Sequence, residues 1–360
     1  MRRMSWIAIS GEGRRWTDDR VFEAALRPRD ALLAKGSLLI ETRLSADGRP
    51  QTLLAFERHH PWPGGLSLQA LPNGSIVLVM SQGDDAFHTL LQYPDDARTD
   101  ILRVTFSWDS TARWGQLALE RPESDRTALR ETPPPPPLLL EDLFSMVRRP
   151  QLCRTDPDLI FFAVSDEVEP VGPMPSLTGR VPVETLDGPR PVAELQSGDT
   201  VRTRCGELAP VLQRLSRVVP ALGSFTPVRL RAPYFGLSRD LVVSPHQRLV
   251  IGGSEVEYLF GREAVLVPAL SLVNGFAAVR EEGAMTLRYH QLLLPAHDAV
   301  MAGGAALESL YIGRLRRSRT HLGASLLADC PTGLLPEQHR KGYQVLHPFE
   351  AITLAQARVA

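Results

Sequence analysis

The sequence predicts an all-β protein with a jelly-roll-like sandwich followed by a second β-domain and a short, partly helical tail. Three observations predict this class. Apolar and polar residues alternate over many short segments, which is typical of strands with one buried and one solvated face. The 30 prolines and 27 glycines indicate frequent turns rather than long helices. A chain of 360 residues is also long enough for two domains.

Composition and charge exclude several classes of partner. The net charge is −1, so the chain has no overall basic field that would attract nucleic acid or an anionic membrane. No run of about 20 apolar residues predicts a membrane span. The N-terminus also lacks the apolar stretch of ~7–15 residues that a signal peptide needs. We therefore expect a cytoplasmic protein by default, with export by a signal-independent route left open.

The sequence predicts no metal and no cofactor. Cys153, Cys205 and Cys330 are far apart, odd in number and without CxxC spacing, which excludes a recognisable zinc site or disulfide framework. Gly303 and Gly304 are interpreted as a turn, because neither a lysine nor a helix signature of a phosphate-binding loop accompanies them.

The first third of the chain is predicted to form the sandwich. Turn signals such as Asp47-Gly48 and Pro72-Asn73-Gly74 separate its apolar segments. Six strands are expected, at residues 37–44, 52–56, 65–71, 75–80, 101–108 and 116–120. The order over residues 35–122 resembles the laminin-G/concanavalin-like jelly roll, and Trp108 is expected to anchor its core. The resemblance implies a carbohydrate- or protein-binding domain.

A run of five prolines at 133–137 favours an extended polyproline conformation and predicts a domain boundary. We therefore expect a sandwich at 1–132 and a proline-rich linker and docking segment at 133–175. Within the latter, residues 139–148 are predicted to be a short amphipathic helix. Residues 159–164 are predicted to be a buried strand or a docking segment.

The second half begins with a more specific pattern. Ser176 precedes a predicted strand, an Asp187-Gly188 turn and then Pro-Val-x-x-Leu-x-x-Gly-Asp-x-Val at 191–201. Residues 240–250 contain Ser-Pro-His-Gln after an apolar strand, and residues 289–303 have the sequence of a closing strand pair. These motifs resemble the Hint (Hedgehog/intein) domain. Residues 259–275 and 346–351 resemble its bacterial subgroup, which gives a Hint domain at 176–312 and a tail at 313–360.

The resemblance implies self-processing chemistry. In a Hint domain the first side chain attacks the preceding carbonyl and converts a peptide bond into an ester or thioester. Here Ser176 would attack Pro175, Ser244 would occupy the position of the family's threonine, and His246 would act on the amide. His297, on the closing strands, is a further catalytic candidate with a structural alternative. No turnover on other substrates is expected.

Three departures from the family pattern bear on activity. A serine hydroxyl is a weaker nucleophile than the usual cysteine. Gln247 occupies the family's histidine position, so in an extended segment His246 would point to the opposite face unless Pro245 introduces a turn. Splicing is not expected, because Glu308 and its neighbours provide no terminal asparagine.

Two hypotheses therefore stay open. In the first, the protein cleaves itself by an N-to-O acyl shift at the Pro175–Ser176 bond. In the second, the Hint domain is a catalytically silent scaffold attached to a lectin-like domain that binds carbohydrate or protein.

Overall fold

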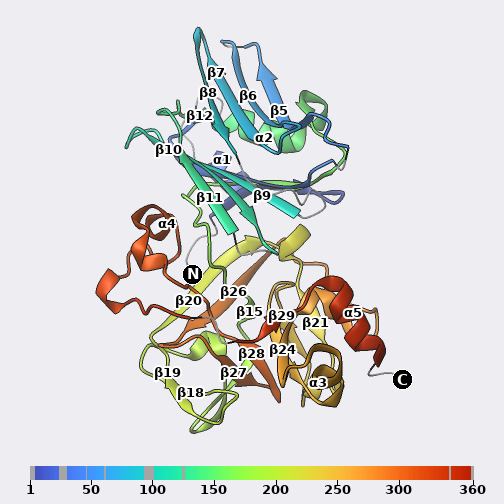
Figure 1. Cartoon of the computed structure of the whole chain (residues 1–360). Helices are drawn as coiled ribbons and strands as arrows, with labels where there is room; N and C mark the ends of the chain where they lie inside the picture. The colour runs from blue at the N-terminus through green and yellow to red at the C-terminus, as the bar shows by residue number, and fades with distance from the viewer. Residues whose placement is uncertain are drawn as a thin grey trace. The chain divides into compact units, whose positions relative to one another are not determined.

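The computed structural model describes residues 5–23, 31–45, 47–60, 62–92, 101–123, 126–339 and 342–357. It divides into two compact units, Met1–Gly172 and Pro173–Ala360. Both consist mainly of β-strands, which confirms the predicted all-β class (Figure 1). Within the described ranges, no helix combines the length and apolarity that a membrane span requires.

The first unit is a sandwich of two antiparallel sheets. The larger has the order β11-β10-β9-β4-β14-β1-β2 and the smaller the order β13-β5-β6-β7-β8 over the described residues. The larger sheet comprises β1 (Trp6–Gly11), β2 (Arg14–Thr17), β4 (Lys35–Arg43), β9 (Ile101–Asp109), β10 (Trp114–Arg121), β11 (Arg126–Glu131) and β14 (Leu159–Ser165). The smaller comprises β5 (Gln51–Arg58), β6 (Gly64–Ala70), β7 (Ile76–Gln82), β8 (Asp85–Leu91) and β13 (Cys153–Arg154).

The core of this unit consists of the apolar side chains that alternate with polar ones along the strands. In β6, Leu66 and Leu68 are buried, whereas Ser67 and Gln69 lie on the other face of the sheet. Trp108 is fully buried, and its indole nitrogen donates a hydrogen bond of 2.9 Å to the carbonyl oxygen of Leu33. Trp108 is therefore a core anchor, as predicted.

The segment expected as a linker differs from the prediction. After the prolines, β12 (Leu138–Leu139) pairs with β3 (Leu32–Leu33), and α2 (Leu140–Arg148) buries the side chains of one face in the sandwich core. Strand β14 then lies between β4 and β1 in the larger sheet. The proline run thus interrupts a domain instead of ending it, because the apolar residues that follow it complete the same core. Strands β1, β2, β8 and β11 were not predicted from the sequence.

The second unit contains a six-stranded sheet of order β20-β26-β15-β22-β21-β25 and a nine-stranded sheet over the described residues. The first comprises β15 (Leu177–Thr178), β20 (Gln213–Pro220), β21 (Val228–Leu230), β22 (Leu241–Val243), β25 (Ala278–Arg280) and β26 (Thr286–Leu293). The second comprises β16 (Pro182–Thr185), β17 (Gly188–Pro191), β18 (Thr200–Arg202), β19 (Leu208–Pro210), β23 (Arg248–Gly252), β24 (Ala264–Pro268), β27 (Ala299–Ala302), β28 (Ala305–Glu308) and β29 (Gln344–Val345).

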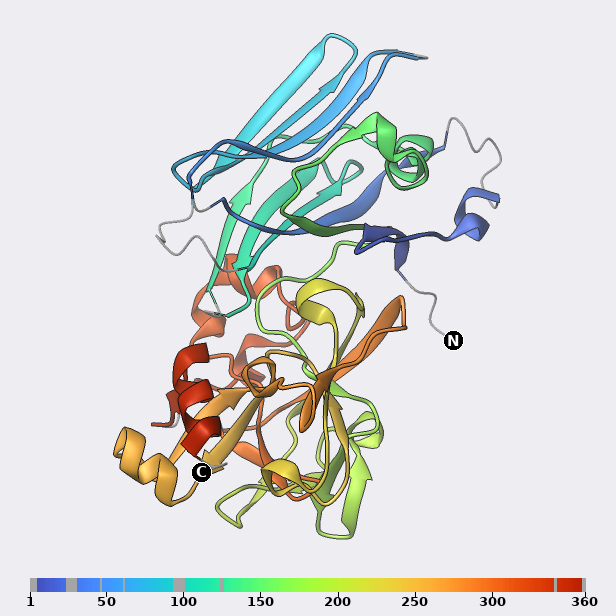
Figure 2. The ribbon, with the colours of Figure 1, turned by 90° about the vertical axis from the view of Figure 1, so that its right-hand side faces the viewer.

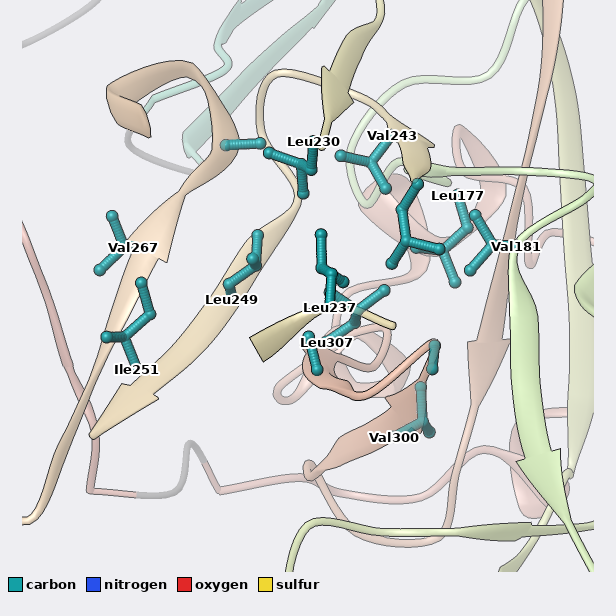
Figure 3. Close-up of a cluster of buried hydrophobic side chains, with 14 of the residues drawn as sticks. Leu177, Val181, Leu230, Leu237, Val243, Leu249, Ile251, Val267, Val300 and Leu307 are labelled. Atoms are coloured by element: carbon teal, nitrogen blue, oxygen red, sulfur yellow. The ribbon is translucent and has the colours of Figure 1, made fainter. Parts of the chain in front are cut away.

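A shared apolar core holds these two sheets together. Leu177 and Val243 of the first sheet, together with Leu249 and Leu307 of the second, belong to one buried cluster (Figure 3). Because Leu177 is fully buried in this cluster, the core fixes the backbone at the residue immediately before it, Ser176.

The tail is part of the second unit. Strand β29 pairs in parallel with β24, and α5 (Pro348–Ala357) packs beside α3 (Ser254–Phe260) (Figure 2). Leu346, Ala351 and Leu354 extend the same buried cluster. The predicted short, partly helical tail is confirmed.

The hairpin between β27 and β28 turns at Gly303 and Gly304. Their φ angles are +55° and +94°, which side chains with a Cβ rarely adopt. A Cβ at Gly304 would lie 2.5 Å from the carbonyl oxygen of Gly236. Glycine is therefore required for the turn that leads into β28 and its last residue, Glu308.

Candidate functional site

Ser176 is buried at the junction of three strands, with 7% of its surface exposed. It follows the buried Pro175 and immediately precedes β15, which lies between β22 and β26. The Ser176 amide donates a hydrogen bond of 3.2 Å to the carbonyl oxygen of His290, and its carbonyl accepts one of 2.7 Å from the amide of Ser244. The backbone on the C-terminal side of the Pro175–Ser176 bond is thus held from both neighbouring strands.

Residues Ser244 to Gln247 form a tight turn after β22. The Gln247 amide donates to the Ser244 carbonyl at 3.0 Å, and the Ser244 hydroxyl accepts a hydrogen bond of 3.4 Å from the His246 amide. A turn at Pro245 was the condition under which His246 could approach the nucleophile. The turn is present, but it brings the side chain of Gln247, not that of His246, to Ser176.

The Ser176 hydroxyl contacts two side-chain amides. It donates a hydrogen bond of 2.6 Å to Oε1 of Gln247 and accepts one of 2.8 Å from Nε2 of Gln291. Gln291 Nε2 also lies 3.2 Å from Gln247 Oε1, so the three side chains form a closed triangle. Both glutamines are buried, with 1% and 3% of their surfaces exposed. We call Ser176, Gln247 and Gln291 the amide cluster.

The geometry of the amide cluster limits its chemistry. Attack by Ser176 on the Pro175 carbonyl requires that the hydroxyl lose its proton to a base. The hydroxyl proton instead points to the side-chain oxygen of Gln247. An amide oxygen accepts a hydrogen bond but does not act as a base near neutral pH. Among the described residues the hydroxyl contacts no histidine, carboxylate or lysine.

Glu308 anchors the amide cluster through its backbone. Its carbonyl oxygen accepts hydrogen bonds of 3.2 Å from Nε2 of both Gln247 and Gln291. Its carboxylate contacts Nη1 of Arg248 at 3.2 Å and Nε2 of His297 at 2.9 Å. One residue therefore links the amide cluster to a buried charged group.

His297 is buried and held in place by its neighbours. Only 2% of its surface is exposed, and its ring packs edge-on against Tyr311 with ring centroids 5.0 Å apart. Its hydrogen bond to the Glu308 carboxylate fixes the orientation of the ring. The hydrogen bonds of Ser176 do not include His297, so the structure does not bring these two predicted site residues together.

His290 lies beside the site but has its side chain turned away from Ser176. Its Nδ1 lies 3.0 Å from Nη1 of Arg214, an arginine that can only donate, so Nδ1 is the acceptor. Burial, followed by the charges of Arg214 and Arg288, lowers the pKa of His290 to about 4. The ring is therefore neutral at physiological pH.

Gln291 and the role of Glu308 were not predicted from the sequence. Gln291 precedes three leucines in a buried strand, where a polar side chain needs a partner. That signal indicates a hydrogen bond but not its partner, which is 115 residues away in the chain. Glu308 ends an apolar strand, and the same reasoning applies to it. No group of His, Cys, Asp and Glu suited to a metal occurs in the described parts of the chain.

The Hint domain family matches residues 175–314. This match begins one residue before Ser176 and contains the whole amide cluster and Glu308. Residues 175–314 are a Hint domain. Membership of the bacterial subgroup stays a prediction, and no curated protein matches the sequence.

Solved structures with some likeness to the chain include inteins and a carbohydrate-binding module. One is the MchDnaB-1 intein, 14% identical, covering 37% of this chain and 98% of the other with a TM-score of 0.24. Another is the AceL NrdHF class 3 split intein, 11% identical, covering 39% and 100% with a TM-score of 0.27. A CBM40 of the Ruminococcus gnavus IT-sialidase, bound to α2,3-sialyllactose, is 12% identical and covers 38% and 78% with a TM-score of 0.29.

Proposed function

We propose that this Hint domain is a silent scaffold, in which the Pro175–Ser176 peptide bond stays intact, carried in one chain with a carbohydrate- or protein-binding sandwich. The observation that supports this most strongly is the amide cluster. The hydroxyl proton of Ser176 is directed at Gln247 Oε1, 2.6 Å away, where a self-processing domain needs a group that takes or relays a proton.

The blocked reaction can be written in full. The Ser176 Oγ would form a bond to the Pro175 carbonyl carbon, the bond from that carbon to the Ser176 nitrogen would break, and the hydroxyl proton would move to the nitrogen. The product is an ester with a free amine. Neither glutamine can accept the hydroxyl proton or supply one to the leaving nitrogen at neutral pH.

Self-cleavage by the same acyl shift is the competing proposal. The observation in its favour is that Ser176 occupies the nucleophile's position directly after Pro175, with little access to water that would compete for the carbonyl. An uncatalysed shift would then give a small population of ester at equilibrium.

Intact mass separates the two proposals. The purified full-length chain is incubated with and without hydroxylamine, which traps an ester by releasing the fragment that ends at Pro175. The scaffold proposal expects one species near 39.7 kDa under both conditions. Ser176→Ala is the matched control, since it removes the nucleophile and leaves the Pro175 carbonyl in the chain. A fragment ending at Pro175 from the wild type, absent from Ser176→Ala, would overturn the scaffold proposal in favour of self-cleavage.

A further inference from the structure

The smaller sheet of the first unit has a groove on the face that points away from its core. The groove has a volume of about 340 Å³, within the range of ~300–1,000 Å³ that small-molecule sites occupy. Thr52 and His59 contribute to its polar lining. The rest of that lining comes from alternate residues of neighbouring strands: Glu57 of β5, Ser67 and Gln69 of β6, Ser81 of β7 and Arg154 of β13. Strands β5, β6 and β7 are adjacent, so these side chains share one surface.

Gly65 keeps the floor of the groove low. It lies opposite Glu57 of β5 and Ser81 of β7, and a Cβ there would lie 3.1 Å from Oγ of Ser81. A side chain at this position would therefore take up space in the groove. The preceding residue, Gly64, faces the other side of the sheet, where a Cβ would lie 2.7 Å from Nη2 of Arg58.

Arg58 holds the end of β5 from the other face of the sheet, since it is the residue after Glu57 and lies opposite Gly64. It forms an ion pair with Asp142 of α2, and the two side chains are 11% and 17% exposed. Its Nε donates a hydrogen bond of 3.0 Å to the Trp62 carbonyl, and its guanidinium lies over the Trp62 ring, 5.0 Å from the centroid. The end of β5 that carries Glu57 is therefore fixed before a ligand binds, so ordering it costs little.

The free polar groups in the groove are balanced in charge. Glu57 and Arg154 are both exposed, and neither forms an ion pair or hydrogen bond with any described residue. The charge of Arg58 is already compensated by Asp142. Ser67 accepts a hydrogen bond of 3.0 Å from Gln69, and its own hydroxyl proton remains available. The groove thus offers donors and acceptors together with no net charge.

This chemistry suits a ligand that is neutral and carries many hydroxyl groups. A hydroxyl can donate to Glu57 while a neighbouring hydroxyl accepts from Arg154, which satisfies both charged groups without adding an ion. An anionic ligand would be attracted by Arg154 but repelled by Glu57, so its charge would bring no net gain in binding. A protein partner would need a large apolar anchor, and the exposed apolar side chains of the groove's lining are Pro63 and Val79, the latter 36% exposed.

We propose that this groove is the binding site of the first unit and that its ligand is a neutral oligosaccharide. The inference rests on the proposed binding role of the sandwich and is independent of the state of Ser176. It assigns hydrogen bonding to Glu57 and Arg154 and the low floor of the site to Gly65.

The test uses the full-length chain and a panel of neutral oligosaccharides from glucans, mannans, xylans and galactans, with sialylated and uronic-acid oligosaccharides as the acidic arm. Ser67→Trp fills the groove from a position whose side chain points away from the core. Arg130→Trp places the same side chain at an exposed position of β11, in the other sheet, and serves as the matched control. Binding is measured by calorimetry, and the melting temperatures of both variants are compared with the wild type.

We expect saturable binding of at least one neutral oligosaccharide, weakened about tenfold or more by Ser67→Trp and unchanged by Arg130→Trp. Arg154→Ala, which removes one hydrogen-bonding group without filling the groove, should weaken binding as well. Binding that is equal in Ser67→Trp and wild type would overturn the groove but leave the binding role of the sandwich. Preference for the acidic arm would overturn the neutral ligand, and no binding in either arm would overturn the inference altogether. None of these outcomes affects the mass measurement on the Hint domain.

Discussion

His290 provides a quantitative test of the second unit. Its pKa is about 4 in the folded protein against 6.5 for an ordinary histidine, because the ring is buried and faces Arg214. Below pH 6.5 the unfolded chain binds a proton that the folded chain does not bind. The free energy of unfolding therefore falls as the pH decreases from 6.5 to about 4, and the total loss is about 3 kcal/mol. Above pH 6.5 the ring is neutral in both states and contributes no pH dependence.

The matched variant is His290→Asn. An asparagine Oδ1 can accept the hydrogen bond that Arg214 donates to Nδ1, but it does not titrate. Other groups that titrate in this range do so in both proteins. Between pH 7 and pH 4 the wild type should therefore lose about 3 kcal/mol more unfolding free energy than the variant loses.

The assay must report on the second unit alone. All five tryptophans, at positions 6, 16, 62, 108 and 114, lie in the first unit, so tryptophan fluorescence follows only that unit. Hydrogen exchange of the amides of β26, measured by mass spectrometry at several denaturant concentrations, follows the strand that contains His290. Fluorescence in the same samples is the internal control and should not differ between the two proteins. A difference in stability that is independent of pH would refute the assignment of His290 as a buried neutral ring.

Two further substitutions test the surroundings of the site, with hydrogen exchange of the second unit as the measurement. Glu308→Ala leaves Arg248 buried without its carboxylate and should cost about 3–5 kcal/mol of stability; a loss below 1 kcal/mol would contradict the buried ion pair. Gly304→Ala forces a side chain into a φ of +94° and within 2.5 Å of the Gly236 carbonyl, for an expected loss of about 1–3 kcal/mol. Gly323→Ala meets no atom within 4 Å and should change stability by less than about 1 kcal/mol, so equal effects at the two glycines would be inconsistent with the turn geometry.

The Hint domain could be predicted because its signals are local. The turn at Gly198-Asp199 and the closing strand pair each depend on a few neighbouring residues, and the structure has a hairpin at Gly303-Gly304 as predicted. Which residue contacts Ser176 was not predictable in the same way. It depends on how the turn at Pro245 is wound, and on a cross-strand neighbour 115 residues away.

The first unit shows where a local signal misleads. A proline run excludes a sheet interior at 133–137, but it says nothing about the segments that follow. Strand β14 is buried in the same sandwich. Its hydrogen-bonded neighbours β4 and β1 both come from the first 43 residues. Long-range pairing of this kind leaves no pattern in the segment that follows the prolines. A boundary at residue 132, predicted from the proline run alone, could therefore not account for this pairing.

In the proposed scaffold, Gln247 stands where the family has a histidine and keeps the Pro175–Ser176 bond intact. Intact mass after incubation with a thiol tests this by comparing Ser176→Cys with the double substitution Ser176→Cys and Gln247→His. We expect the double variant to release a fragment ending at Pro175, whereas Ser176→Cys alone remains a single species. Cleavage at the same rate in both variants, or in neither, would contradict it.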